Sequence, residues 1–259
     1  GIGPEIILKA LKHADVYDRC RPLVVGDRRM LERAVPWVGA EGLTFETVET
    51  PSEGSYRAGI VTVLDLKDAD PADVPIGLET AGGGAAAAAA VFAACDLAMA
   101  GDVAAVVTAP LNKAAMHMAG FKYPGHTELL AERTGAGKIT MLLTGPNLRV
   151  VHVSMHVGLE EAIRRVTTER VLETIRLAAE ACRQLGIASP RIAVAGLNPH
   201  AGEGGLFGRQ EIEQVAPAIE MARSPDRRVR TKASVITVAA TSRATISRRT
   251  MKRSMKDQA

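Results

Sequence analysis

Apolar runs alternate with amphipathic segments along residues 1–223, and Gly, Pro, Asn and Asp separate one segment from the next. This alternation is typical of βα units, in which helices join buried strands. Hydrophobic residues make up 47% of the chain but aromatic residues only 3%, so the core must consist mainly of Ala, Val, Leu and Ile. Such a core suits helices packed on a parallel sheet, and we therefore expect an α/β fold.

Two short apolar segments in the first half of the chain are predicted to be buried strands. They are Arg21–Gly26 and Ala104–Thr108, and each runs directly into a turn. Between them, Ala85–Ala100 follows three glycines and stops at Gly101, which favours a helix ended by a glycine. These segments agree with the α/β class.

A hairpin is predicted in the second half, where Lys138–Thr144 and Leu148–Ser154 flank the turn residues Gly145, Pro146 and Asn147. Three more elements follow: a helix capped by Thr168 and running to Leu185, a strand at Arg191–Ala195, and a helix at Arg209–Arg223.

The cysteines and the longest apolar run bear on the cellular compartment. Cys20, Cys95 and Cys182 lie far apart without a CxxC pair, and an odd count without a signal peptide favours a reducing compartment. No apolar run reaches the roughly 18 residues needed to cross a bilayer, because Asp96 and Asp102 close the Ala-rich segment. We therefore expect a cytoplasmic protein that does not span a membrane.

Charge divides the chain into two parts. Residues 224–259 hold ten Lys and Arg against two acidic residues, a net charge of +8, which leaves −5 for the remainder of the +3 chain. This tail has no Gly, Leu or aromatic residue, and its single apolar run is Val235–Ala240. We expect it to be disordered or outside the pattern of the preceding domains, because it buries too little apolar area to offset the entropy of ordering.

The glycine-rich loop Gly196–Gly205 contains the strongest candidate for a metal ligand, His200. The loop follows a predicted buried strand, and sites of α/β proteins form at the carboxyl ends of strands. Its small residues allow a ligand to approach the backbone closely. A lone loop histidine has an alternative interpretation as an ordinary exposed side chain.

Two further histidines lie near the predicted hairpin. If Val150–Met155 is extended, period 2 places His152, Ser154 and His156 on one face. Imidazoles from separate strands can share a metal, although no short-range ligand spacing such as HExxH is present. His152 also fits the alternative of a buried, hydrogen-bonded residue.

A candidate anion site lies at the start of a predicted helix, where Gly125 is followed by His126, Thr127 and Glu128. Thr127 is predicted to cap this helix, and free N–H groups with the helix dipole favour an anion such as phosphate. Lys113 can add positive charge to the same anion. The alternative is a structural cap, an exposed histidine and a solvated lysine.

Taken together, these motifs resemble the 4-hydroxythreonine-4-phosphate dehydrogenase family of vitamin B6 synthesis. The matching segments occur in the family's order over about residues 1–223: Gly1–Glu5 (GIGPE), Thr108–Lys113 (TAPLNK), Gly125–Glu128 (GHTE) and Gly196–Gly205 (GLNPHAGEGG). A similar sister group acts on 4-phospho-D-threonate or 4-phospho-D-erythronate, and the motifs do not separate the two groups. The family oxidises a phosphorylated hydroxy acid, with decarboxylation, by means of NAD or NADP and a divalent metal.

The resemblance implies a fold like that of isocitrate and isopropylmalate dehydrogenases, with two α/β domains around a cleft and an active site completed by the second subunit of a homodimer. We expect a first domain at 1–118, a second at 119–223 and the basic tail at 224–259. The opening GIGPE lacks a preceding strand, so we expect an N-terminal piece to be absent.

Site residues follow from the same resemblance. His126 and Thr127 would hold the substrate, with Lys113 nearby, and His156 and His200 would be two of three histidine ligands to Zn, Co or Mg. The family's third histidine lies in an MYHDQ segment, but this chain has Lys256 at that position. No catalytic or nicotinamide-binding residue is assigned.

Two other classes of function stay open at this point. A metal-dependent phosphatase also uses histidines and a phosphate-binding helix start, but usually needs more carboxylate ligands than Glu160, Glu161 and Glu203 provide. A binding module is the second alternative, because a tail of charge +8 can contact nucleic acid. The lack of aromatic residues in that tail argues against it.

Overall fold

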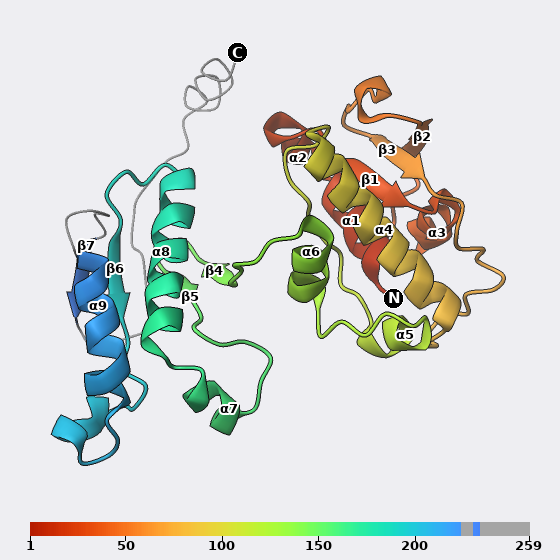
Figure 1. The fold of residues 1–259 in the computed structure, drawn as a ribbon. Helices are drawn as coiled ribbons and strands as arrows, with labels where there is room; N and C mark the ends of the chain where they lie inside the picture. Colours follow the sequence, from red (N-terminus) through yellow and green to blue (C-terminus); the bar gives the residue numbers. More distant parts are fainter. Residues whose placement is uncertain (224–229, 234–259) are drawn as a thin grey trace. The chain divides into compact units, whose positions relative to one another are not determined.

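In the computed structural model, residues 1–223 and 230–233 are described, and these residues form two compact units that divide after residue 137 (Figure 1). The boundary that we predicted after residue 118 falls inside the first unit, because helices on both sides of that point pack against the same long helix. Each unit has its own hydrophobic core.

The first unit contains a parallel sheet of three strands in the order β1-β3-β2. These strands are β1 (Leu23–Gly26), β2 (Thr44–Val48) and β3 (Ile60–Asp65). The central strand β3 buries Val61 and Val63 completely, and Val63 is in register with Val24 of β1. The strand predicted at 21–26 is therefore confirmed, and so is the parallel sheet expected of an α/β protein.

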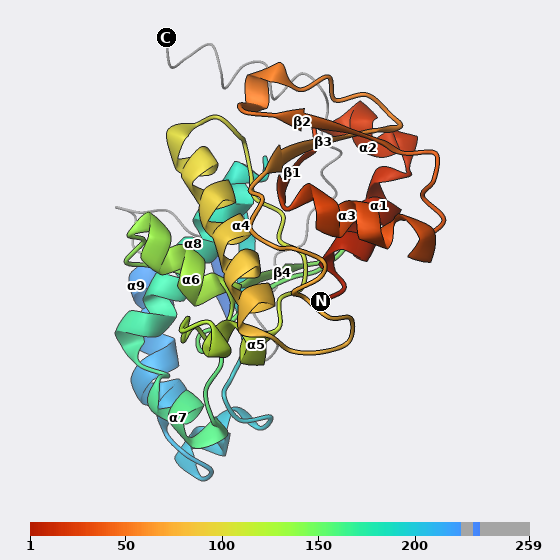
Figure 2. The same cartoon turned by 90° about the vertical axis from the view of Figure 1, so that its right-hand side faces the viewer.

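Short helices pack beside this sheet and complete its core. They are α1 (Gly3–Leu11), α2 (Ala14–Arg19), α3 (Arg28–Ala34), and the 3₁₀ turns η1 (Val35–Trp37) and η2 (Pro51–Glu53). Figure 2 shows α1 and α3 lying side by side, where Leu8 and Leu31 join the core. The Asp27 carboxylate caps α3 by accepting a hydrogen bond from the Arg29 N–H at 2.9 Å.

Three helices form a second layer of the first unit: α4 (Ala81–Ala100), α5 (Lys113–Met118) and α6 (His126–Thr134). One buried residue from each helix, Ala88, Met116 and Leu129, forms their common core. Gly101 ends α4 in the left-handed conformation with φ of 82°, as the sequence predicted. Gly84 lies so close to α5 that a Cβ there would be 2.0 Å from the Ala115 carbonyl oxygen.

The helix α4 is the one candidate membrane span among the described residues, judged by its length of 20 residues and mean hydropathy of 1.6. Core helices of globular proteins pass the same test. Within the first unit, α4 contacts β1, α5 and α6. These contacts bury 22% of the apolar window of α4, with Ala88 and Cys95 among its buried residues.

The strand predicted at Ala104–Thr108 is wrong, because this segment forms no strand. Its residues join no sheet, and Val107 is 95% exposed. A strand needs a hydrogen-bonded neighbour. Among the described residues, the sheet of the first unit ends at β1 without such a neighbour for this segment.

The second unit begins with the predicted hairpin, β4 (Leu142–Thr144) and β5 (Arg149–Val151). The strands are antiparallel, and the Gly145 N–H donates to the Leu148 carbonyl at 2.8 Å to close the turn. Both strands are shorter than predicted. A separate parallel pair is formed by β6 (Arg191–Val194) and β7 (Arg230–Ala233).

Helices of the second unit are α7 (Leu159–Arg164), α8 (Thr168–Gln184), the π-helical turn η4 (Glu211–Val215) and α9 (Ala216–Arg223). The segment η3 (Ala201–Gly205) is a kinked turn whose inner residues have non-helical backbone angles. Helix α8 buries Val171, Ile175 and Ala178 in a core shared with the strands and α9. The predicted cap of α8 needs correction by one residue. The Thr167 hydroxyl accepts from the Arg170 N–H at 3.2 Å, whereas Thr168 is the first helical residue.

The tail that we predicted at 224–259 contributes one described element. Residues 230–233 form β7 and pair in parallel with β6 from Arg191 to Val194. The remainder of that prediction concerns 224–229 and 234–259, which lie outside the described residues.

Candidate functional site

The helix α6 begins at a glycine. Gly125 is the N-cap residue, and it has no side chain to accept a hydrogen bond from the N–H groups of the first turn. The prediction that Thr127 caps this helix is therefore wrong: Thr127 is the second helical residue, and its hydroxyl lies past the capping position. An uncapped helix start offers N–H donors and a partial positive charge to an anion.

His126 occupies the first helical position of α6 and is half-buried. Its Nε2 atom is buried, and within the described residues it has no hydrogen-bond partner. Burial lowers the pKa of the His126 imidazole, which favours the neutral form. A neutral imidazole can donate one hydrogen bond from Nε2, and the proton there would suit a ligand oxygen.

Lys113 begins α5 in the same unit and is exposed. The preceding residue fixes this helix start: the Asn112 Oδ1 atom accepts from the Ala115 N–H at 2.8 Å, and Nδ2 donates to Glu79 at 2.8 Å. In the described part of the chain, no hydrogen bond or ion pair joins Lys113 to His126. The structure thus places both residues in the first unit, on different helices that pack on α4.

His156 lies in a turn after the hairpin, not at the end of a strand. The strand β5 stops at Val151, so the period-2 argument that placed His152, Ser154 and His156 on one face is wrong. His156 has φ of 53°, in the left-handed region, and it is exposed. A left-handed residue other than glycine costs about 1–2 kcal/mol, so the turn imposes a conformation that the residue disfavours.

His200 is also exposed, with 69% of its side chain accessible, and local hydrogen bonds hold its backbone. The Asn198 Oδ1 atom accepts from the His200 N–H at 2.8 Å, and the Glu211 carboxylate accepts from the Asn198 N–H at 2.8 Å. The His200 side chain has two neighbours. Its Nδ1 atom lies 3.6 Å from Glu203 Oε1, and the centroid of its ring lies 6.1 Å from the centroid of the Phe207 ring.

The backbone after His200 is left-handed over five consecutive residues. Ala201, Gly202, Glu203, Gly204 and Gly205 have φ of 50°, 75°, 45°, 66° and 107°. Only the three glycines adopt such angles readily. Strain of about 1–3 kcal/mol per non-glycine residue persists only where surrounding structure fixes it, and such strain often marks functional sites.

The donor chemistry of His156 and His200 fits zinc or cobalt, since both metals accept imidazole ligands. Among the described residues, however, no three His, Cys, Asp or Glu side chains form a group that could hold a metal. These two histidines belong to the second unit, and a complete ligand set requires donors in addition to them.

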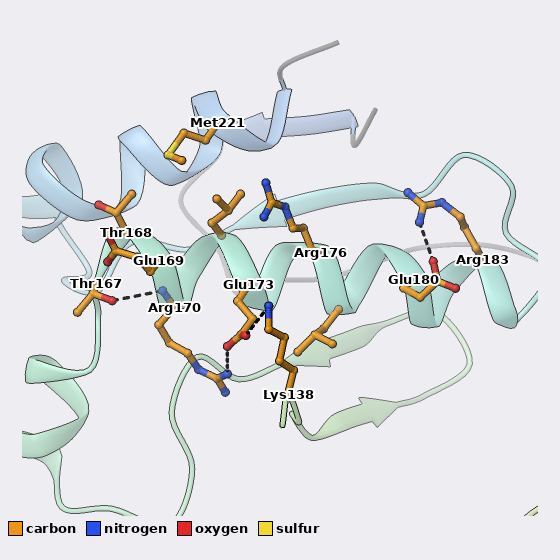
Figure 3. Close-up of a pocket in the computed structure, with 12 residues that line it drawn as sticks. Lys138, Thr167, Thr168, Glu169, Arg170, Glu173, Arg176, Glu180, Arg183 and Met221 are labelled. Carbon is orange, nitrogen blue, oxygen red and sulfur yellow. Dashed lines mark hydrogen bonds and ion pairs between the residues drawn. The ribbon is translucent and has the colours of Figure 1, made fainter. Parts of the chain in front are cut away.

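A groove of about 820 Å³ runs along the charged face of α8, but it contains none of the predicted site residues (Figure 3). Its charges are largely paired. Arg170 Nη1 lies 2.8 Å from Glu173 Oε2, and Lys138 Nζ lies 3.6 Å from the other oxygen of that carboxylate. Paired charges on a helix face indicate a structural role.

Arg170 fastens the hairpin segments to α8. Its Nε donates to the Val153 carbonyl at 2.8 Å and its Nη2 to the Ile139 carbonyl at 3.3 Å. These carbonyls flank the hairpin on both sides, and Val153 lies three residues before His156. Arg170 therefore positions the segment that leads to His156.

Sequence reasoning missed both Arg170 and Glu211. Each is a charged residue within a helical pattern, where exposure to solvent is the ordinary expectation. The signal for Glu211 was indirect: the small residues of Gly196–Gly205 indicate that some group approaches the backbone closely. In the structure, the Glu211 carboxylate of the same chain is one of the groups that lie close to this backbone.

Comparison with known proteins yields a family match over most of the chain. Residues 18–235 match the family model of the pyridoxal phosphate biosynthetic protein PdxA. A 4-hydroxythreonine-4-phosphate dehydrogenase of Desulforapulum autotrophicum is 45% identical over 225 residues, which cover 86% of this chain and 66% of the relative. A D-threonate 4-phosphate dehydrogenase of Cupriavidus necator is 44% identical over 230 residues, covering 88% and 68%. The chain thus spans about two thirds of the length of these curated relatives.

Solved structures agree with this match. A crystal structure of 4-hydroxythreonine-4-phosphate dehydrogenase from Klebsiella pneumoniae superposes with a TM-score of 0.81 at 38% identity, covering 90% of this chain and 69% of that one. The predicted fold class, α/β of the isocitrate and isopropylmalate dehydrogenase type, is confirmed by this similarity. The family match continues to residue 235, beyond the segment in which the motifs were found.

Proposed function

Because the chain belongs to the PdxA family of pyridoxal phosphate biosynthetic proteins, we propose that it serves the oxidation of a small phosphorylated hydroxy acid with NAD or NADP as the hydride acceptor. Relatives named 4-hydroxythreonine-4-phosphate dehydrogenase and D-threonate 4-phosphate dehydrogenase support this substrate class. 4-Phosphooxy-L-threonine is the first candidate substrate, and 4-phospho-D-threonate or 4-phospho-D-erythronate is the second.

The observation that carries the proposal is the open start of α6. His126 presents a buried Nε2 atom without a partner among the described residues, directly at a helix start whose N-cap residue is a glycine. In this proposal, backbone N–H groups, the His126 imidazole and the Thr127 hydroxyl bind phosphate oxygens, and Lys113 adds positive charge. These groups hold and orient the substrate by its phosphate end.

His156 and His200 are the proposed protein ligands of a divalent metal, zinc or cobalt by ligand type, with magnesium as the harder alternative. Such a metal, when bound, lowers the pKa of the substrate hydroxyl and stabilises the negative charge left by loss of CO₂. A nicotinamide, when bound, would accept the hydride that the hydroxyl-bearing carbon of the substrate gives up. A homodimer with a shared active site and a cytoplasmic location are part of the same proposal.

Calorimetric titration tests the phosphate site. Unaltered chain should bind 4-phosphooxy-L-threonine and, more weakly, inorganic phosphate. His126→Ala should weaken both by about 10-fold or more, because a hydrogen bond to a charged group is worth about 1.5–3 kcal/mol. His117→Ala, an exposed histidine of α5, is the matched control and should leave affinity unchanged.

Two further outcomes bear on the proposal. Formation of NADH or NADPH in the presence of metal and one candidate acid would identify the substrate among the alternatives. Equal affinity of the parent and His126→Ala for every phosphorylated acid would remove the assignment of α6 as the phosphate site.

A further inference from the structure

One carboxylate lies close to the backbone on both sides of His200 and bonds to it on one side. Glu211 Oε1 accepts from the Asn198 N–H at 2.8 Å. A Cβ added to Gly196 would lie 3.3 Å from that same oxygen, and a Cβ added to Gly202 would lie 3.2 Å from Oε2. The two oxygens of Glu211 therefore lie against the backbone before and after His200.

We propose that Glu211 is a positioning residue for His200. This inference rests on the proposed function, in which His200 binds a metal, and it adds a residue that acts through the backbone. Two hydrogen bonds connect Glu211 to His200 through Asn198. The Glu211 carboxylate accepts from the Asn198 N–H, and the Asn198 side chain accepts from the His200 N–H at 2.8 Å.

Backbone strain explains why the loop needs such a residue. Ala201 and Glu203 are left-handed within an unbroken left-handed run from 201 to 205, a conformation that neither residue favours on its own. His200 is exposed, so packing of its own side chain contributes little to its placement. The backbone must therefore set the direction of the imidazole, and Glu211 is the half-buried side chain that contacts this backbone on both sides.

The local structure around Glu211 supports a positioning role. Glu211 begins the π-helical turn η4. Such turns are rare in proteins as a whole, but those that occur often lie at functional sites. Two residues along the same turn, Glu213 is exposed and pairs with Arg209 at 2.5 Å. The turn thus carries one carboxylate that faces the His200 loop and another on its surface, which provides a matched control.

Amide hydrogen exchange of the full chain tests the contact itself. In Glu211→Ala, exchange of the Asn198 and His200 amides should become at least about 10-fold faster, since each has lost a partner or the group that fixed it. Glu213→Ala should leave both amides unchanged. Glu211→Gln keeps an acceptor oxygen and should restore slow exchange, whereas Glu211→Asp is too short to reach and should resemble Glu211→Ala.

Cobalt titration tests the consequence for the metal site. Loss of a group that orients a ligand costs about 10–100-fold in metal affinity. We therefore expect Glu211→Ala and Glu211→Asp to weaken Co²⁺ binding by that factor and to alter its visible spectrum. Glu213→Ala and Glu211→Gln should stay within about threefold of the parent.

The outcomes separate the two proposals. If His200→Ala binds Co²⁺ as tightly as the parent, the metal assignment fails, while the exchange data still decide whether Glu211 holds the loop. If Glu211→Ala does not fold, Glu211→Asp and Glu211→Gln carry the comparison. Unchanged exchange at Asn198 and unchanged Co²⁺ affinity in Glu211→Asp would overturn the positioning role.

Discussion

The starts of α6 and α8 are two solutions to the same problem of unpaired backbone donors. At α8, Thr167 caps the Arg170 N–H, and the Gln214 side-chain oxygen accepts from both the N–H and the hydroxyl of Thr168 at 2.9 and 3.0 Å. At α6, the N-cap residue is Gly125, which has no side chain to accept from the N–H groups of the first turn.

This difference distinguishes a helix start that only stabilises the fold, in α8, from one that can bind an anion, in α6. Side chains of the second unit accept hydrogen bonds from N–H groups at the start of α8, so an anion that binds there would have to displace them. The start of α6 combines open donors with a buried, unpartnered nitrogen of His126. An anion bound at this helix start would supply an acceptor for the His126 Nε2 proton.

The largest effect on stability is expected when a buried side chain that packs α6 against its neighbours is removed. Leu129 is fully buried between Ala88 and Met116, so Leu129→Ala should lower the stability of the first unit by about 2–5 kcal/mol. Urea unfolding followed by hydrogen exchange in α6 measures the loss. Leu78→Ala, at a side chain 68% exposed, should change stability by less than about 0.5 kcal/mol. A loss under 1 kcal/mol for Leu129→Ala would mean that this cluster does not hold α6.

A medium effect is expected from the two threonines. Thr167→Ala removes a true cap and should cost about 1 kcal/mol in the second unit. Thr127→Ala removes no cap and should cost less than about 0.5 kcal/mol, but it should weaken binding of a phosphorylated acid. Chemical denaturation and calorimetry of both variants give the two quantities. Equal losses of stability would break the contrast between the helix starts.

The smallest effect concerns pH. Burial lowers the pKa of His126, so below about pH 6.5 the unfolded chain takes up a proton that the folded first unit does not. Stability of this unit should therefore fall as the pH drops below about 6.5, and the fall should end near the lower folded pKa. His126→Asn should remove this part of the pH dependence, as urea titrations at several pH values would reveal. Saturating phosphate ligand should oppose the fall, because an anion beside His126 favours its protonated form.

Periodicity and glycine positions were sufficient to predict much of the fold. Apolar runs gave β1 and β6, and Gly101 ended α4 where expected. The same reasoning failed at Ala104–Thr108, because an apolar run does not reveal whether a neighbouring strand exists to pair with it. It also missed the cap of α8 by one residue, since Thr167 and Thr168 are equivalent until the helix geometry is known.

The candidate site was less accessible to sequence reasoning. Motifs identified His126 and His200, but not that the backbone after His200 is left-handed over five residues. Glycines account for only three of those angles, and Ala201 and Glu203 give no such signal in sequence. The role of Glu211 depends on contacts 13 residues away along the chain, and no local pattern encodes a contact at that separation.

The pairing of β6 with β7 has a consequence for the order of folding. Hairpin β4–β5 brings together residues only nine positions apart, Leu142 and Val151, and hairpins of this kind form in about 1–10 μs. Arg191 of β6 pairs with Arg230, 39 positions further along the chain. Closing so long a loop has an entropic cost that is met before the strand pairing stabilises the chain. Pairing of distant strands is therefore slower than pairing of strands in a hairpin. We therefore expect β6 to complete its pairing after the hairpin has closed, with its edge open to other strands until then.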